Sequence, residues 1–433
     1  MDLRAALAYL NRHVNLEATA GRVEGLSLDR MRRLAEVQGD PQHAYPTIHL
    51  TGTNGKGSTA RMISALLAAS GLSVGTYTSP HLQTINERLT WNGDPISDDA
   101  FAALIAGLAT LEPLTGVTPS YFELVTAAAF GWFADLAVDV AVVEVGLLGR
   151  WDATNVADGT VAVITNVGQD HTDAGPGWRE QVAREKAGIV KPGATLVLGE
   201  TDPALRPVFA DTPAGEIWGR DTHFGCEQNA VAVGGRLLDV RTPGGLLEEV
   251  YLPLHGAHQG DNAAVAVAAT EAFFGSPLAA DVVNEAFTDL SVPGRFEVAH
   301  RDPTVVLDGA HNIDGVVTAR TTLAEDFTLL GAVILVVGLL DGRDPQEMLE
   351  ALGAEEAALV VACTPPSPRA LPAAELAAVA TRVGAVAEAV AEVADAVGRA
   401  LAVAGPDDLV LVTGSLYVVG AARTALAEEV QYS

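Results

Sequence analysis

A glycine-rich run between an expected strand and an expected helix constrains this chain more than any other feature. The run Thr51–Thr59 reads TGTNGKGST, follows the β-like segment Thr47–Leu50 and precedes the Ala/Leu-rich segment Arg61–Ala69. Glycines let successive backbone N–H groups point at phosphate oxygens, and the N-terminus of the following helix adds partial positive charge. Because Gly57 follows Lys56, the spacing departs from the standard P-loop. Lysine and serine in a strand–loop–helix context still favour a nucleotide-phosphate site over a structural turn.

Lysine is scarce in this chain. Of its 26 lysines and arginines, three are lysines, at Lys56, Lys186 and Lys191. Arginine therefore supplies nearly all the positive charge, and a retained lysine points to a use for its compact, titratable amine. Lys56 has such a use in the glycine-rich run. For Lys191, retention by chance in an arginine-biased composition explains the residue equally well.

The composition excludes several classes of function. With 433 residues, 49% of them hydrophobic and 19% charged, the chain is expected to fold into two or three well-packed globular domains. Its formal net charge of −29 argues against nucleic-acid and anionic-membrane partners, so any anion site must be built locally. Cys226 and Cys363 form no metal or redox motif, which favours a reducing, cytoplasmic setting.

Neither a leader peptide nor a membrane span is expected. Residues 1–4 open an amphipathic helix, and the polar stretch Asn11–His13 interrupts any apolar run there, so a signal peptide is not predicted. The longest β-like apolar run, Ala332–Leu340, is too short to cross a bilayer.

Short β-like segments alternate with Ala/Leu-rich segments along most of the chain, which is typical of parallel α/β sheets. Between residues 229 and 254 the pattern changes to β-like segments with Gly-Gly turns, which predicts a small antiparallel insert. The best linker candidate is Val292–Arg295. We therefore expect an N-terminal domain over residues 1–294, with a parallel sheet, the glycine-rich loop and that insert; the family resemblance described below implies that it is a P-loop ATPase domain. A C-terminal doubly wound α/β domain is expected over residues 295–433.

Polar side chains follow several of the expected strands. Glu144 ends the otherwise apolar strand 140–145, and His171 comes shortly after the next strand, Val161–Asn166. Because α/β sheets bind ligands at the carboxyl ends of their strands, we expect Glu144 and His171 on adjacent strand ends as a Mg²⁺ pair beside the phosphate loop. Ser79 offers a hydroxyl at the same edge, although a proline-containing turn explains its segment equally well.

The C-terminal half repeats this arrangement. Asp308 follows the expected strand Thr304–Leu307, Asn262 lies near the start of an expected helix, and Arg295 lies in the linker. If the two domains face each other, these groups could clamp a nucleotide between them. Each is also individually compatible with capping or turns.

Together these runs resemble the Mur ligase superfamily, and specifically the folylpolyglutamate synthase and bifunctional dihydrofolate synthase family. The matching motifs occur in the family's order and span nearly the whole chain. They are TGTNGKGS (51–58), TSPHL (78–82), FExxT (122–126), EVGLxGRxDATN (144–155), DH (170–171), EKAGI (185–189), HQxxN (258–262), PGRFE (293–297), DGAHN (308–312) and GSLY (414–417).

The resemblance implies an ATP-dependent ligase that adds L-glutamate to a folate, and to dihydropteroate, through an acyl phosphate. It implies ATP and two Mg²⁺ ions as cofactors, a carbamate on Lys186, and a monomer with small-molecule partners only. The implied catalytic residues are Lys56, Lys186 and His171, and the implied magnesium ligands are Ser79, Glu144 and His171. The implied nucleotide-binding residues are Thr53, Asn54, Gly55, Lys56, Gly57, Ser58, Asn262, Arg295 and Asp308. The implied substrate-binding residues are Gly25, in an early pterin loop over residues 24–31, with Phe122, Trp151, Asp152, Ala153, His311 and Ser415.

The sequence departs from the family pattern in a few places. Leu148 stands where glycine is usual, Trp151 where leucine is usual, and Asp341–Asp344 replaces an Asp-Lys-Asp motif. These departures leave open the details of the pterin pocket, the accepted folate and whether both activities occur. A Mur-type ligase for a cell-wall precursor and a non-catalytic nucleotide-binding protein are the alternatives. The TSPHL and FExxT motifs argue against the first, and the intact set of lysines, glutamate and histidine argues against the second.

Overall fold

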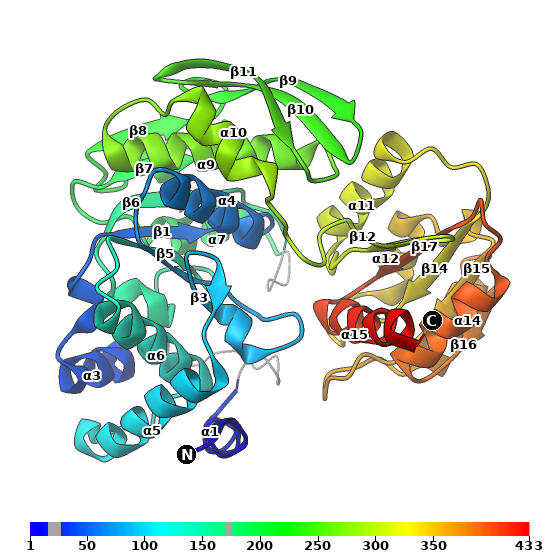
Figure 1. The fold of residues 1–433 in the computed structure, drawn as a ribbon, viewed down its shortest axis with the longest axis horizontal. Helices are drawn as coiled ribbons and strands as arrows, with labels where there is room; N and C mark the ends of the chain where they lie inside the picture. The colour runs from blue at the N-terminus through cyan, green and yellow to red at the C-terminus, as the bar shows by residue number, and fades with distance from the viewer. Residues whose placement is uncertain (16–26, 170–174, 433) are drawn as a thin grey trace.

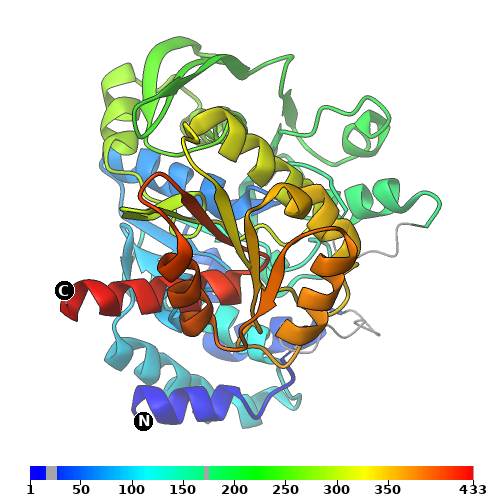
Figure 2. The ribbon, with the colours of Figure 1, turned by 90° about the vertical axis from the view of Figure 1, so that its right-hand side faces the viewer.

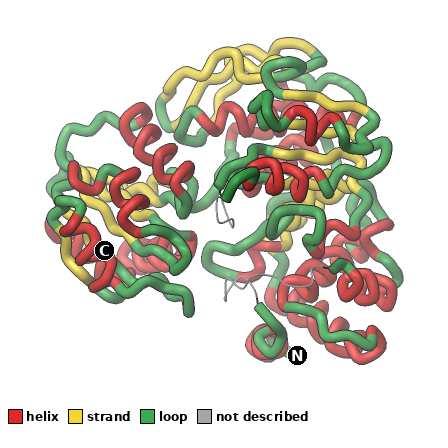
Figure 3. The backbone as a smooth tube through the Cα atoms, turned by 180° about the vertical axis from the view of Figure 1, so that it is seen from behind, coloured by secondary structure: helices red, strands yellow, loops and turns green. Residues whose placement is uncertain are grey.

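Two α/β lobes lie side by side in Figure 1. A computed structural model describes residues 1–15, 27–169 and 175–432, with side chains up to residue 428. The first lobe contains the elements from α1 to α10, and the second contains those from β12 to α15. The view from behind in Figure 3 shows the same separation, and residues 289–296 connect the lobes.

An eight-stranded sheet forms the centre of the first lobe. Its order is β4-β3-β2-β5-β1-β6-β7-β8; the strands from β2 to β8 in that order are parallel, and β3 and β4 form an antiparallel edge. All residues of β1 are buried, as expected for a central strand covered on both faces. The strands are β1 Thr47–Thr51, β2 Val74–Tyr77, β3 Leu89–Trp91, β4 Asp94–Pro95, β5 Val140–Glu144, β6 Gly159–Ile164, β7 Thr195–Leu198 and β8 Glu216–Gly219.

Helices cover both faces of this sheet. On one face α4, α9 and α10 pack over β1, β5 and β6 with an aliphatic core. The other face carries α1, α3, α5 and α6 over β2 and β5, with α7 and α8 over β6 and β7. The helices are α1 Leu3–Leu10, α3 Asp29–Gln38, α4 Lys56–Ala69, α5 Asp98–Thr115, α6 Tyr121–Asp135, α7 Trp178–Ala187, α8 Arg206–Ala210, α9 His258–Phe274 and α10 Ala280–Thr288.

An antiparallel three-stranded sheet lies over α9 at the top of Figure 1. Its strands are β9 Gly225–Ala232, β10 Gly235–Thr242 and β11 Gly245–Leu252. The insert predicted over residues 229–254 is therefore confirmed, and it begins four residues earlier than expected, at Gly225.

The second lobe is built on a six-stranded sheet of order β12-β13-β17-β14-β15-β16, in which only β12 is antiparallel. Helices α11 to α13 cover one face of it, and α14 and α15 cover the other (Figure 2). The strands are β12 Glu297–Arg301, β13 Thr304–Leu307, β14 Val333–Val337, β15 Leu359–Ala362, β16 Ala387–Ala389 and β17 Leu409–Thr413. The helices are α11 Ile313–Asp326, α12 Pro345–Leu352, α13 Ala373–Arg382, α14 Val393–Val403 and α15 Leu416–Tyr432.

The α/β architecture predicted from the alternating pattern is confirmed, but one neighbour relation is wrong. Glu144 and His171 were expected to follow adjacent strands, whereas β5 and β6 lie on opposite sides of β1. The reason is that chain order does not fix spatial order in a doubly wound sheet. The chain passes through α4 from β1 to β2, returns to β5 beside β1, and then crosses to β6. The direction of winding thus reverses at β1, which is where such sheets bind ligands.

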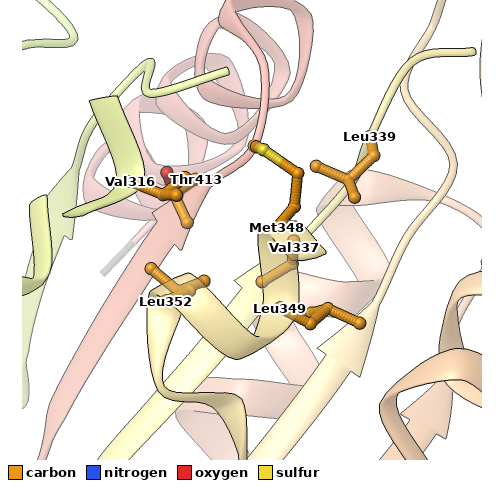
Figure 4. A pocket seen from close by; sticks show the side chains of 8 residues that line it. Val316, Val337, Leu339, Met348, Leu349, Leu352 and Thr413 are labelled. Carbon is orange, nitrogen blue, oxygen red and sulfur yellow. The ribbon is translucent and has the colours of Figure 1, made fainter. Parts of the chain in front are cut away.

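A small apolar hollow in the second lobe carries no chemistry. Met348, Leu349 and Leu352 of α12 line it together with Val337 and Leu339 from the region of β14 (Figure 4). It is a packing space within the core. Among the residues that the structure describes, no helix combines the length and apolar character that a bilayer span requires.

Candidate active site

The glycine-rich loop between β1 and α4 is held in shape by the end of β6. Gly55, the N-cap of α4, has a φ of 82°, a left-handed conformation that glycine adopts without strain. Asn166 Oδ1 accepts hydrogen bonds from the backbone N–H groups of Thr53 at 3.1 Å and Asn54 at 2.9 Å. Thr165 Oγ1 donates to the Asn54 carbonyl at 2.7 Å. The loop is therefore preorganised at the positive end of α4, as an anion site requires.

Lys56 lies over this loop. Its Nζ donates to the carbonyl oxygens of Gly52 at 3.1 Å and Thr53 at 3.2 Å. Phosphate oxygens bound in the loop could replace these acceptors without moving the helix. Gly57 follows, and a β carbon there would lie 3.8 Å from Glu144 Oε2, so this carboxylate lies beside the first turn of α4.

Glu144 is a buried carboxylate at the end of β5. Only 3% of it is exposed, and its Oε2 accepts a hydrogen bond from the Ser79 N–H at 3.1 Å. Burial raises the pKa of Glu144, while Lys56, the Ser79 hydrogen bond, Arg295 and Arg61 act in the opposite direction. The structure thus brings together Glu144 and Ser79, which were both predicted as magnesium ligands.

Asn262 lies against the same loop from α9. A β carbon on Gly55 would be 2.5 Å from Asn262 Oδ1, so the two residues are in direct contact. Asn262 is buried, and its Nδ2 donates to Gln259 Oε1 at 3.0 Å. This fixes the amide beside the phosphate loop.

The connection between the lobes contributes Arg295, and the second lobe contributes Asp308. Asp308 is buried, and its carboxylate accepts hydrogen bonds from the N–H groups of Phe296 at 3.2 Å and Ala310 at 3.0 Å. Burial raises the pKa of Asp308, and the positive charge of Arg295 opposes this shift. The positive charge of Arg295 also acts to lower the pKa of Glu144, and a β carbon on Gly309 would lie 2.8 Å from Arg295 Nη1, next to Asp308 in the chain.

Two further substrate candidates lie in the second lobe. His311 Nδ1 is 2.8 Å from the Gly309 carbonyl oxygen, which orients the ring. Ser415 is 1% exposed, and its Oγ accepts a hydrogen bond from the Val418 N–H at 3.2 Å at the start of α15. The Ser415 hydroxyl therefore caps a helix.

Lys186 is buried near the end of α7, with 3% of its surface exposed. It packs behind the segment that follows Glu144, since a β carbon on Gly149 would lie 3.2 Å from Lys186 Cα. The Arg150 N–H donates to the carbonyl of Glu185 at 2.9 Å and fixes this packing.

The predicted pterin segment is partly buried. Trp151 is 42% exposed, whereas Asp152 and Ala153 are buried. The Asp152 carboxylate accepts hydrogen bonds from the N–H groups of Thr154 at 3.0 Å and Leu147 at 2.9 Å. Asp152 therefore shapes the turn into the 3₁₀ helix η3 (Ala153–Val156), and Trp151 is the side chain that this segment presents outward.

Phe122 and Leu148 border the same segment. A β carbon on Gly146 would lie 2.5 Å from Phe122 Cζ, so the Phe122 ring covers this backbone. Leu148 has a φ of 58°, the left-handed region that disfavours side chains with a β carbon. A glycine at this position would adopt the same φ without that strain.

Two predicted residues, His171 and Gly25, lie outside the described residues. Sequence reasoning missed Asn166 and Asn312 as parts of the site. The signal for Asn166 was present, since it is a polar residue directly after a buried strand. Asn312 belongs to a matched motif, but its contact partner lies 258 positions away.

The donors present suit a hard divalent cation. Glu144 and Ser79 supply oxygen atoms, which Mg²⁺ prefers, and the buried Glu144 carboxylate would gain from a neighbouring cation. Within the described ranges, which leave out His171, no three His, Cys, Asp or Glu side chains come together as a metal site.

The chain is similar to proteins of known activity. The Mur ligase middle domain family matches residues 108–270, and the Mur ligase glutamate ligase domain family matches residues 294–416. The dihydrofolate synthase/folylpolyglutamate synthase of Mycobacterium tuberculosis is 39% identical over 449 residues, which cover 94% of this chain and 91% of that protein.

Solved structures give the same result. The M. tuberculosis folylpolyglutamate synthase complexed with ADP and AMPPCP superimposes with a TM-score of 0.89 at 37% identity, over 98% of this chain and 99% of that chain. A bifunctional folylpolyglutamate synthase/dihydrofolate synthase with Mn, AMPPNP and L-glutamate bound gives a TM-score of 0.86 at 31% identity, over 99% of this chain and 98% of that chain. With this likeness over nearly its whole length, the chain belongs to the folylpolyglutamate synthase/dihydrofolate synthase family of Mur ligases.

Proposed function

We propose that this ATP-dependent ligase joins L-glutamate to a folate and also to dihydropteroate. The observation that carries the proposal is that the phosphate loop lies beside the buried Glu144 and contacts Asn312 of the second lobe. The relatives' names supply the substrate class, and their complexes contain nucleotide, a divalent metal and L-glutamate.

The first chemical step brings two anions together. A carboxylate oxygen of the pterin substrate attacks the γ-phosphorus of ATP, the bond to ADP breaks, and an acyl phosphate results. Lys56 is placed to turn from the loop carbonyls toward the phosphates and to stabilise charge on the transferred group. The loop N–H groups and the N-terminus of α4 hold the phosphates in place.

Glu144 and Ser79, with His171, would hold Mg²⁺. When bound there, the metal would screen the phosphate charges and orient them. Glu144 contributes a negative charge from a buried position, where electrostatic interactions are strong. We propose that the enzyme binds two Mg²⁺ ions.

A carbamate on Lys186 is also proposed. Its support is the match to the EKAGI motif and the burial of Lys186 behind the segment that follows Glu144. A carbamate would convert a buried cation into an anion and would supply oxygen atoms of the kind that Mg²⁺ prefers.

The second step joins the amine of L-glutamate to the acyl phosphate. The amine attacks the acyl carbon, the carbon–oxygen bond to phosphate breaks, and a proton leaves the nitrogen as the amide forms. We assign recognition of glutamate to the second lobe, with His311 and the neighbourhood of Ser415 as candidates. Arg295 and Asp308 would contact the nucleotide beside them. Trp151 and Phe122, with the loop that contains Gly25, are the candidates for the pterin side.

Three further points belong to this proposal. The domain boundary is placed between residues 294 and 295, within the connection between the lobes. The enzyme is proposed to act as a monomer. It is proposed to act in the cytoplasm, the reducing setting that two isolated cysteines favour.

One assay tests the function. Purified protein is supplied with ATP, Mg²⁺ and L-glutamate, together with either dihydropteroate or tetrahydrofolate, while released phosphate and the mass of the product are measured. We expect phosphate release with each pterin only when glutamate is present, and a product heavier by one glutamyl residue. Absence of ligation with both pterins would overturn the folate assignment. Ligation with one pterin alone would overturn the dual activity.

A further inference from the structure

One side-chain contact joins the phosphate loop directly to the second lobe. Asn312 Nδ2 donates to Asn54 Oδ1 at 3.0 Å, and the reverse pair, Asn54 Nδ2 and Asn312 Oδ1, is 3.5 Å apart. The two residues are 258 positions apart in the chain. The loop that binds phosphate and the lobe assigned to glutamate therefore meet through two amide groups.

Asn312 is fixed on its own side of this contact. It is 2% exposed and is the N-cap of α11, where its Oδ1 accepts a hydrogen bond from the Gly315 N–H at 2.8 Å. Because the cap uses Oδ1, the amide nitrogen is turned toward Asn54. His311, the candidate for glutamate recognition, is the adjacent residue and contacts the Gly309 carbonyl of the same turn.

Asn54 is equally fixed in the first lobe. Its N–H donates to Asn166 Oδ1, and its carbonyl accepts from Thr165 Oγ1 at 2.7 Å and from Asn166 Nδ2 at 3.1 Å. A second contact runs parallel to the first, since a β carbon on Gly168 would lie 2.5 Å from Asp314 Oδ2. The start of α11 thus lies against both loops at this edge of the sheet.

We propose that Asn312 is a positioning residue. Its hydrogen bond to Asn54 fixes the position of the second lobe relative to the phosphate loop. The proposal rests on the proposed function, since it concerns the meeting of an acyl phosphate beside the loop with an amine held by the second lobe. This Asn54–Asn312 hydrogen bond, called the bridge below, keeps the site for the glutamate amine at a fixed distance from the γ-phosphate. Without it the lobes can still associate, but the amine meets the acyl phosphate less often.

Two measurable consequences follow from a loosened register. A misplacement of about 1 Å between reacting groups can lower the rate on the order of 10²-fold, so we expect kcat for ligation to fall roughly 10- to 100-fold. Nucleotide affinity should remain within about twofold, because the loop backbone is held by Asn166 and not by the bridge. An acyl phosphate that waits for its amine is open to water, so phosphate release per amide formed should rise.

The variant Asn312→Ser isolates the bridge. Serine ranks with asparagine as an N-cap, so α11 keeps its cap, but the shorter side chain cannot reach Asn54. Ser97→Asn is the matched control, because Ser97 caps α5 on the exposed surface by accepting a hydrogen bond from the Ala100 N–H at 3.2 Å. Asn54→Ala and the double variant complete a double-mutant cycle.

Each variant is assayed for melting temperature, ATP affinity, kcat and the ratio of phosphate released to amide formed. We expect Asn312→Ser to melt within a few degrees of the wild type, to raise this ratio and to lower kcat. The double variant should be no worse than Asn54→Ala alone, since both changes break the same contact. Ser97→Asn should match the wild type in all four measurements.

A wild-type ratio and kcat in a folded Asn312→Ser protein would overturn the positioning role. Fully additive losses in the double-mutant cycle would also overturn it, because the two side chains would then act separately. These outcomes differ from a failure of the proposed function, in which the wild type itself forms no amide with either pterin.

Discussion

A buried ion pair between the lobes supports the sharpest stability prediction. Arg236 of β10 and Asp326, the last residue of α11, have side chains 3% and 0% exposed, and Arg236 Nη2 lies 3.0 Å from Asp326 Oδ1. Asp326 Oδ2 also accepts a hydrogen bond from the Gly256 N–H at 2.7 Å. An acidic residue at a helix C-terminus is disfavoured by the helix dipole, so this carboxylate depends on its partners in the first lobe.

The variant Arg236→Met removes the cation but keeps the apolar stem. It leaves a buried carboxylate with backbone donation from Gly256, and breaking a buried pair in this way costs about 3–5 kcal/mol. The double variant Arg236→Met/Asp326→Asn should lose about 2 kcal/mol of unfolding free energy relative to the wild type, less than the single variant loses. The reason is that a neutral amide oxygen can still accept the hydrogen bond from the Gly256 N–H. Arg320→Met is the control, since Arg320 and Glu356 form a pair within the second lobe with side chains 44% and 66% exposed. Its loss should cost less than about 1 kcal/mol.

The distribution of tryptophan makes the assay specific. All five tryptophans lie before residue 219, so their fluorescence reports on the first lobe, whereas far-ultraviolet circular dichroism reports on both. In urea titrations we expect Arg236→Met to separate the two transitions, because the lobes lose a coupling contact. The reasoning would be refuted by a loss below about 1 kcal/mol in Arg236→Met, or by a double variant at least as unstable as that single variant.

The remaining predictions concern catalysis and pH. Lys56→Ala should lower ligation roughly 10²-fold or more without unfolding the protein, while Lys191→Ala should stay active; equal turnover of both in the phosphate assay would contradict the loop assignment. Glu144→Gln should raise the Mg²⁺ concentration needed for half-maximal activity with little change in melting temperature, and an unchanged magnesium titration would count against it. Lys186→Ala should be inactive and partly rescued by short carboxylates, and a high-resolution density map showing a bare ammonium at Lys186 in the active, magnesium-bound enzyme would exclude the carbamate. Burial lowers the pKa of His49 to about 3, and the charge of Lys191 adds to this shift. As the pH falls, His49 is therefore protonated in the unfolded chain at a higher pH than in the folded protein. Stability should therefore fall as the pH drops below the unfolded value of about 6.5, by about 2 kcal/mol at pH 5 from this residue, and His49→Gln should lose less between pH 7 and pH 5 in urea titrations.

The local parts of this site were predictable from sequence because their signals are local. The residues of the phosphate loop lie within nine consecutive positions of the sequence. An acidic residue at the end of an apolar strand, as at Glu144, is also recognisable from its immediate neighbours. The order of β5, β1 and β6 was not predictable, because hydrophobic periodicity says nothing about which strands pair. The contact between Asn54 and Asn312 was hidden for the same reason. Arg236 and Asp326 resemble ordinary surface charges until the lobes are brought together.

The scarcity of lysine has a practical consequence for chemical labelling. Lys56 Nζ is held on the Gly52 and Thr53 carbonyl oxygens, Lys186 is buried, and Lys191 Nζ donates to the Asn155 carbonyl at 2.9 Å. An amine-directed reagent therefore finds few lysine side chains to react with besides Lys56, because arginine supplies nearly all the positive charge of this chain. Labelling at Lys56 can be followed by mass spectrometry in the unmodified wild-type sequence, and protection of that one amine by ATP gives a binding isotherm without a reporter mutation.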